Sequence, residues 1–117
     1  FGHTLGHAIE SAMKYKGILH GEAVSIGMNF AAAISVEQST LEIMEYNLLE
    51  DTLLKLGLPI HLPSSISDKS IMKHMSFDKK KKNGKNHLVL LESIGKSFIC
   101  DKLTDSYISK FVKTFQS

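Results

Sequence analysis

One stretch of the sequence is apolar on almost every side of the helix that it predicts. His20-Gly21 begins this helix, and Glu22 occupies its first turn, where a carboxylate faces the positive end of the helix dipole. A helix that is apolar nearly all round is buried, whereas a surface helix keeps one polar face. The other elements must therefore pack around this helix, which is predicted to be the centre of the fold. Its apolar residues are Ala23, Val24, Ile26, Gly27, Met28, Phe30, Ala31, Ala32, Ala33 and Ile34.

Two further helices are predicted before and after the central one. The first covers about residues 2–16, with Gly17 as its C-terminal cap, and its internal glycines indicate that another backbone or a ligand approaches closely. The other begins at Ser39-Thr40 and ends at Gly57 and Pro59. A mainly apolar stripe runs along it, and the methionines are expected to fill the core. The stripe consists of Leu41, Met44, Leu48, Leu49, Thr52 and Leu56.

A loop and a short helix are predicted in the next part of the chain. The loop covers residues 58–67, and Ser67-Asp68 caps a helix that is expected to end near Met75. Four lysines follow from Lys79, and such a run is ordinarily a solvated loop. Asn83-Gly84 then marks a turn.

The last part of the chain contains the only predicted strands. Residues 87–91 and 97–100 predict a β-hairpin, and Thr104-Asp105 begins a last amphipathic helix. The fold class is therefore mainly α, a helical bundle with one small β-hairpin, in one domain over residues 1–117.

The histidines are concentrated at the start of the chain. If this segment is helical, His3 and His7 are one turn apart on one face, and Glu10 falls beside them. Imidazoles grouped with a carboxylate suit a divalent metal of the zinc type. Since Cys100 is the single cysteine, nitrogen and oxygen must hold any metal, which is typical of catalytic rather than structural zinc sites. Spacing alone favours His3 and His7 as a chelating pair.

Composition limits the classes of function. The net charge of +2 is too small to indicate a nucleic-acid or membrane partner. The longest apolar stretch is broken by Gly27, Asn29 and Ser35, so no membrane-spanning segment is predicted. The single cysteine fits a reducing, cytoplasmic setting. The sequence begins at Phe1 inside the histidine motif, so the chain is expected to be part of a longer polypeptide.

Four segments of the chain form a recognisable set: FGHTLGHAIE (residues 1–10), LHGEAVSIGM (residues 19–28), MSFDKKK (residues 75–81) and VLLESIG (residues 89–95). Together they resemble the C-terminal domain of the 3-dehydroquinate synthase family, among the sugar phosphate cyclases. Their order and spacing fit the family, and the resemblance spans nearly the whole chain. It implies a two-domain enzyme, in which an N-terminal domain binds NAD and a helical C-terminal domain contributes metal and substrate ligands.

The resemblance also implies roles for individual residues. His3 and His20 are implied to be two ligands of a zinc or cobalt ion, with a glutamate of the N-terminal domain as the third. His7 then faces the substrate. We follow this assignment over the one from spacing, because three protein ligands leave metal positions open for a substrate oxygen. Lys79 matches a lysine that reaches the substrate at its phosphate end.

The family's reaction converts 3-deoxy-arabino-heptulosonate 7-phosphate to 3-dehydroquinate and phosphate in the shikimate pathway. The resemblance implies a NAD-dependent transient oxidation, phosphate elimination, reduction and aldol cyclisation.

The resemblance also implies a homodimer, with the chain's own N-terminal domain as a partner. Residues 1–117 alone are expected to be inactive and to bind zinc weakly. From spacing, Glu10 and Glu22 are candidates to orient the imidazoles.

Three alternatives remain. A related sugar phosphate cyclase would act on another sugar phosphate with the same motifs. A metal-dependent polyol dehydrogenase shares the two-domain plan but is not expected to carry the lysine segment. A non-enzymatic helical module would bind a partner or nucleic acid through residues 79–85, with a salt-sensitive affinity and no need for zinc. This last alternative leaves the histidine-glycine runs unexplained.

Overall fold

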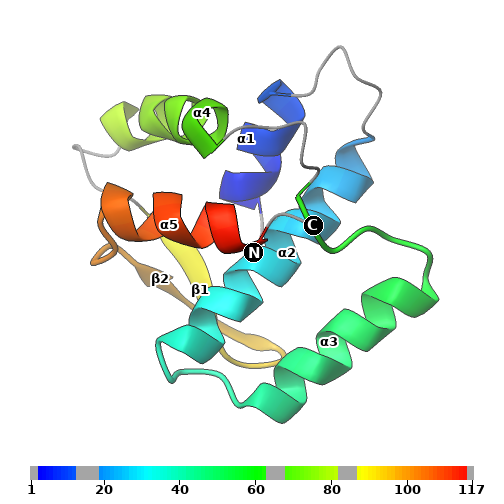
Figure 1. The fold of residues 1–117 in the computed structure, drawn as a ribbon. Coiled ribbons are helices and arrows are strands. Elements are labelled where there is room, and N and C mark those ends of the chain that lie inside the picture. Colours follow the sequence, from blue (N-terminus) through cyan, green and yellow to red (C-terminus); the bar gives the residue numbers. More distant parts are fainter. Residues whose placement is uncertain (1–2, 13–18, 63–67, 82–86, 116–117) are drawn as a thin grey trace.

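The computed structural model describes residues 3–12, 19–62, 68–81 and 87–115, and within these ranges every side chain except those of residues 3–5, 68 and 76–81. The described part of the chain forms five helices and one hairpin (Figure 1). Its fold class is the predicted one, mainly α with a small antiparallel hairpin. In chain order the elements are α1 (His3–Ala12), α2 (His20–Glu37), α3 (Ile43–Lys55), α4 (Asp68–Lys81), β1 (Leu88–Ser93), β2 (Lys96–Cys100) and α5 (Asp105–Phe115).

The α2 helix is the buried central helix that the sequence predicts. Figure 1 shows α1, α4 and α5 on one side of it and α3 on the other. Helices α1 and α3 and strand β1 all pack against α2. Phe30, in the middle of α2, is buried and makes edge-to-face contacts with Phe111 and Phe115 of α5, at ring-centroid distances of 5.5 and 5.3 Å. Contact on several sides explains why α2 is apolar nearly all round.

One apolar core joins every element except α3. Buried residues reach it from each direction, with Ile9 from α1, Ile71 from α4, Leu90 from β1 and Ile108 from α5. The α3 helix packs instead on a smaller cluster, through the partly buried side chains of Tyr46 and Leu49. The buried residues of this smaller cluster are Ala32, Leu41 and Leu91.

The few buried polar side chains of α2 attach the loop after α3 and the hairpin to this helix. The Ser25 hydroxyl donates to the carbonyl oxygen of Pro59 at 2.7 Å. Asn29 Nδ2 donates to the next carbonyl of the same loop at 3.1 Å. The Ser35 hydroxyl accepts from the backbone N–H of Leu91 in β1 at 2.9 Å. Because these groups are buried, losing one partner would leave the other unsatisfied, which is why they specify the packing.

The hairpin pairs β1 and β2 in the antiparallel direction, from Leu88 with Cys100 to Ser93 with Lys96. Ile94 and Gly95 connect the strands, and Gly95 has φ of 93°, a conformation that glycine adopts without strain. The predicted hairpin is confirmed, and its strands extend further toward the turn than the sequence indicates.

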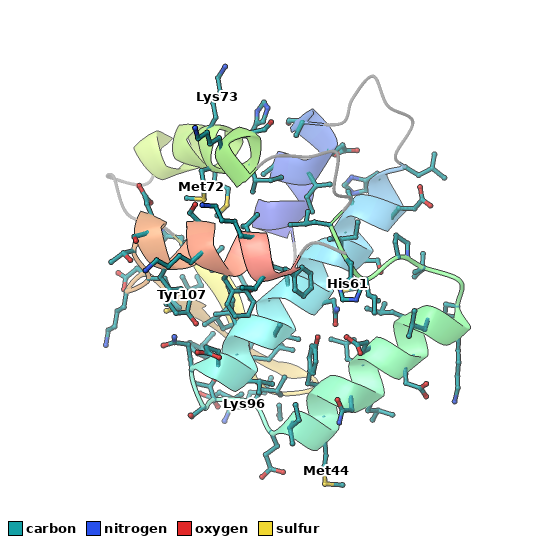
Figure 2. The ribbon with its side chains drawn as sticks, in the orientation of Figure 1. Met44, His61, Met72, Lys73, Lys96 and Tyr107 are labelled. Carbon is teal, nitrogen blue, oxygen red and sulfur yellow. The ribbon has the colours of Figure 1, made fainter. Side chains whose placement is uncertain are left out.

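The stripe predicted along α3 is partly wrong. Met44 is 77% exposed and Leu48 is 59% exposed, and Figure 2 shows Met44 pointing away from the domain. The helix face that packs on α2 carries Tyr46, Leu49 and Leu53 instead. Met44 is therefore not a core methionine, because α3 covers only one side of the domain and leaves its opposite face open.

The α4 helix is longer than predicted. It continues past Met75 through the lysine run to Lys81, so the first three lysines form its last turn rather than a loop. Lysine has good helix propensity and is favoured at the negative end of the helix dipole.

For α1, the predicted end at residue 16 and the Gly17 cap lie outside the described residues. No helix in the described ranges is both long enough and apolar enough to cross a membrane.

Candidate functional site

Gly6 lets α1 approach the start of α2 closely. It is buried, and a Cβ added to it would lie 3.3 Å from Val24 Cα and 3.4 Å from the carbonyl oxygen of Ala23. These neighbours are backbone atoms, so a larger residue would push the two helices apart. Close approach of another backbone is what the sequence predicts for glycine within this helix. The contact brings one face of α1 beside His20, the first residue of α2.

Three polar side chains meet at this junction, His7 and Glu10 from α1 and His20 from α2. The ring centroids of His7 and His20 are 6.2 Å apart, and the ring planes are inclined at 36°. His20 Nδ1 lies 3.1 and 3.2 Å from the two carboxylate oxygens of Glu10. Both imidazoles are exposed and Glu10 is partly exposed, so the cluster lies at the surface of this chain. A small molecule or another domain can reach it there.

Glu22 has a different described contact. Its Oε1 accepts a hydrogen bond from the backbone N–H of Leu19 at 3.0 Å. This interaction caps the first turn of α2 and so fixes the helix that carries His20. Of the two carboxylates that spacing suggests as partners of the imidazoles, Glu10 is the one that the structure places against a ring.

The other two candidate residues are located by their backbone. His3 begins α1, one turn before His7 and on the same side of the helix. Lys79 lies in the last turn of α4. Figure 1 shows that end of α4 directed away from α1 and from the start of α2, although the helix itself packs on α1. The side chains of His3 and Lys79 lie outside the described residues.

The donor atoms at the junction fit a divalent ion held by nitrogen. Zinc binds imidazole nitrogen at about 2.0–2.1 Å, and two rings with centroids 6.2 Å apart can face the same small group. Among the described side chains, no group of three or more His, Cys, Asp or Glu is placed to hold a metal. His20 can therefore supply one ligand of a site that further ligands would complete, such as His3 or a residue of another domain, and His7 lies beside it.

Solved structures of two enzymes of one class share this fold. One is 2-epi-5-epi-valiolone synthase from Streptomyces hygroscopicus subsp. jinggangensis 5008 with NAD+ and Zn2+ bound, with a TM-score of 0.85 and 25% sequence identity over 98% of this chain and 31% of that protein. The other is 2-deoxy-scyllo-inosose synthase complexed with carbaglucose-6-phosphate, NAD+ and Co2+, with a TM-score of 0.81 and 27% identity over 98% of this chain and 32% of that protein. The fold is that of the C-terminal third of the sugar phosphate cyclases.

Within this class, the 3-dehydroquinate synthase C-terminal family matches residues 1–81, and the chain belongs to that family. A 3-dehydroquinate synthase from Vesicomyosocius okutanii subsp. Calyptogena okutanii is 39% identical over 97% of this chain and 32% of its own length. One from Coxiella burnetii is 38% identical over 96% of this chain and 31% of its own length. The chain thus spans about a third of the length of the curated relatives that it matches.

Sequence reasoning located the junction but not its contacts. The spacing of His7 and Glu10 predicts a shared helix face, and the glycines predict close packing. The pairing of Glu10 with His20 joins two helices across a segment outside the described residues, so helical periodicity could not choose between Glu10 and Glu22. Away from the junction, His61 packs its ring against Phe115 at a centroid distance of 5.6 Å.

Proposed function

We propose that this chain is the metal- and substrate-binding domain of a 3-dehydroquinate synthase, and that an N-terminal domain of the same polypeptide binds NAD. The observation that carries the proposal is the junction of α1 and α2, where His7, Glu10 and His20 meet in a chain of this family. The relatives named 3-dehydroquinate synthase at 38–39% identity favour this reaction over those of the structural neighbours at 25–27% identity.

The proposed reaction converts 3-deoxy-arabino-heptulosonate 7-phosphate to 3-dehydroquinate and phosphate. When bound, NAD would accept and return a hydride, and a zinc or cobalt ion would polarise a substrate oxygen. The structural neighbours contain these groups, with NAD+ and Zn2+ in one and NAD+ and Co2+ in the other. The homodimer and the cytoplasmic location implied by the resemblance stay predictions.

The chain's own residues have separate roles in this proposal. His3 and His20 hold the metal from two helices. His7, whose ring lies beside that of His20, hydrogen-bonds the substrate and moves protons, because imidazole can donate or accept near neutral pH. Lys79 holds the phosphate end of the substrate as a positive charge. This role requires the substrate to reach the last turn of α4, which Figure 1 shows directed away from the start of α2.

The test is a steady-state assay of phosphate release from the heptulosonate phosphate by the full-length parent protein with NAD. Lys79→Ala should raise KM about 10- to 100-fold, since a hydrogen bond to a charged group contributes about 1.5–3 kcal/mol. Lys81→Ala, in the same helical turn, is the control and should leave KM unchanged.

Three outcomes would count against the proposal. Phosphate release from glucose 6-phosphate but not from the heptulosonate phosphate would assign the parent to another sugar phosphate cyclase. Oxidation of a polyol without phosphate release would assign it to the dehydrogenases. Equal KM values for the two lysine variants would remove Lys79 from the site.

A further inference from the structure

We propose that Glu10 is a positioning residue that fixes the orientation and tautomer of His20, so that Nε2 is the ring nitrogen presented to the metal. The inference deepens the proposed function and rests on the role of His20 as a metal ligand. It concerns the partner that a metal-binding imidazole needs on its other nitrogen, which is commonly a carboxylate or a backbone carbonyl.

The contact between Glu10 and His20 determines which nitrogen carries the proton. Both carboxylate oxygens lie near the same atom, His20 Nδ1, at 3.1 and 3.2 Å. A carboxylate can only accept a hydrogen bond, so Nδ1 must be the donor. A neutral imidazole has one donor and one acceptor nitrogen, and the acceptor is then Nε2. A metal binds the nitrogen that lacks a proton, so the contact selects Nε2 of His20 as its ligand.

The backbones on both sides of the contact are held in place. Glu10 follows Ala8 and Ile9, which are buried in the core, and Gly6 presses the same helix against α2. On the other side, His20 begins α2, whose first turn is capped by Glu22. The carboxylate and the ring therefore meet between two fixed helix segments, and the ring need not be ordered when the metal binds.

The contact between Glu10 and His20 is too exposed to water for its main role to be stabilising the fold. The His20 side chain is 56% exposed and that of Glu10 is 38% exposed. An ion pair this accessible to water contributes little to folding. Removal of the Glu10 carboxylate should therefore change metal binding while leaving the fold intact.

The experiment uses the full-length parent protein, metal-free, and measures zinc affinity by competition with a chromogenic chelator. Glu10→Ala should bind zinc about 10- to 100-fold more weakly than wild type, the usual effect of removing such a partner. Glu10→Gln should lose less affinity, because its amide oxygen can still accept from Nδ1. Glu22→Gln is the matched control, since it removes a nearby carboxylate charge without removing an acceptor of the ring. It should bind zinc as wild type does.

A second readout follows the tautomer directly. In the metal-free protein with 15N-labelled histidine, the His20 ring should show a protonated Nδ1 and an unprotonated Nε2 at a pH where it is neutral. His20→Ala identifies its signals. In Glu10→Ala, the ring should exchange between both tautomers, while far-UV circular dichroism and the melting temperature stay at wild-type values. A purely structural role would not change the tautomer.

The outcomes separate the inference from the function on which it rests. Wild-type zinc affinity in His20→Ala would overturn the ligand role itself. Weak binding in His20→Ala together with wild-type affinity in Glu10→Ala would overturn only the role of Glu10. Equal losses in Glu10→Ala and Glu22→Gln would also overturn it, because the effect would then come from charge near the site. If the His20 ring kept its wild-type tautomer in Glu10→Ala, that result would likewise overturn the role of Glu10.

Discussion

At the scale of single residues, Tyr46 has the most distinctive environment away from the histidines. Its hydroxyl donates to Glu50 Oε2 at 2.8 Å, on the face of α3 that packs against α2. Asn29 Nδ2 of α2 donates to the same carboxylate oxygen at 3.3 Å. Burial, and then the hydrogen bond and charge of Glu50, raise the pKa of Tyr46 from 10.0 to about 12. The neutral phenol is therefore part of the contact between the two helices.

This raised pKa predicts a stability that declines in alkaline solution. In the unfolded chain Tyr46 loses its proton near pH 10, whereas the folded state keeps it to about pH 12. The folded state binds more protons in this window, so the contribution is complete below pH 10 and is lost as the pH rises through about 12. Urea unfolding at about pH 9 and about pH 11 should show a smaller loss of unfolding free energy in Tyr46→Phe than in wild type. Parallel losses in the two proteins would contradict the assignment.

Residue types and their spacing predicted which side chains could form the site, because His7 and Glu10 are neighbours on one helix face. Spacing could not identify the partner of His20, since that contact depends on how two helices cross. The same limit applies to Met44, whose apolar character predicts burial. Its 77% exposure follows from which face of α3 meets α2, and the stripe pattern did not determine that face.

At the scale of elements, the contact of α1 with α2 brings the residues of the candidate site together. A Cβ added at Gly6 would lie 3.3–3.5 Å from backbone atoms of α2, and Glu10 and His20 meet one turn further along α1. In an isolated helix, alanine would be about 1 kcal/mol better than glycine. At this position the added methyl group would have to displace the backbone of a buried helix.

Gly6→Ala should therefore lose zinc affinity in the full-length parent without gaining stability, because the shift separates Glu10 from His20. Gly21→Ala is the control. It lies in the first turn of α2, and a Cβ added there meets nothing within 4 Å. That variant should keep wild-type zinc affinity and be as stable as wild type or more so. A Gly6→Ala protein with higher stability and unchanged zinc affinity would show that the close approach is not needed.

The limits of helices show why local sequence could not determine every element. The sequence predicted the start of α2 at His20, where Glu22 and the apolar run agree. It placed the end of α4 too early, because a run of lysines is polar on every face and gives no periodic signal. In the structure the helix continues to Lys81, since α4 already packs on α1 and α5 and lysines suit its last turn.

At the scale of the whole molecule, the packed core of this chain holds in place some of the residues of the proposed metal and substrate site. One core joins α1, α2, α4, the hairpin and α5. His7 and His20 lie at the surface, where α1 crosses the start of α2. The chain covers about a third of its curated relatives, so the proposed NAD-binding domain and third metal ligand would come from the rest of the parent protein. Metal and substrate would then bind between the two domains, a frequent position for such sites.

The most direct test of this account measures phosphate release from the heptulosonate phosphate by the full-length parent with NAD, before chelation, after chelation and after zinc is restored. Wild type should lose activity with the chelator and regain it with zinc. In all three conditions His20→Ala should be at least about 100-fold less active than untreated wild type. His61→Ala, which changes a histidine that packs on Phe115, should behave as wild type does. Activity that resists chelation, or full activity in His20→Ala, would contradict the central claim that His20 holds a catalytic metal.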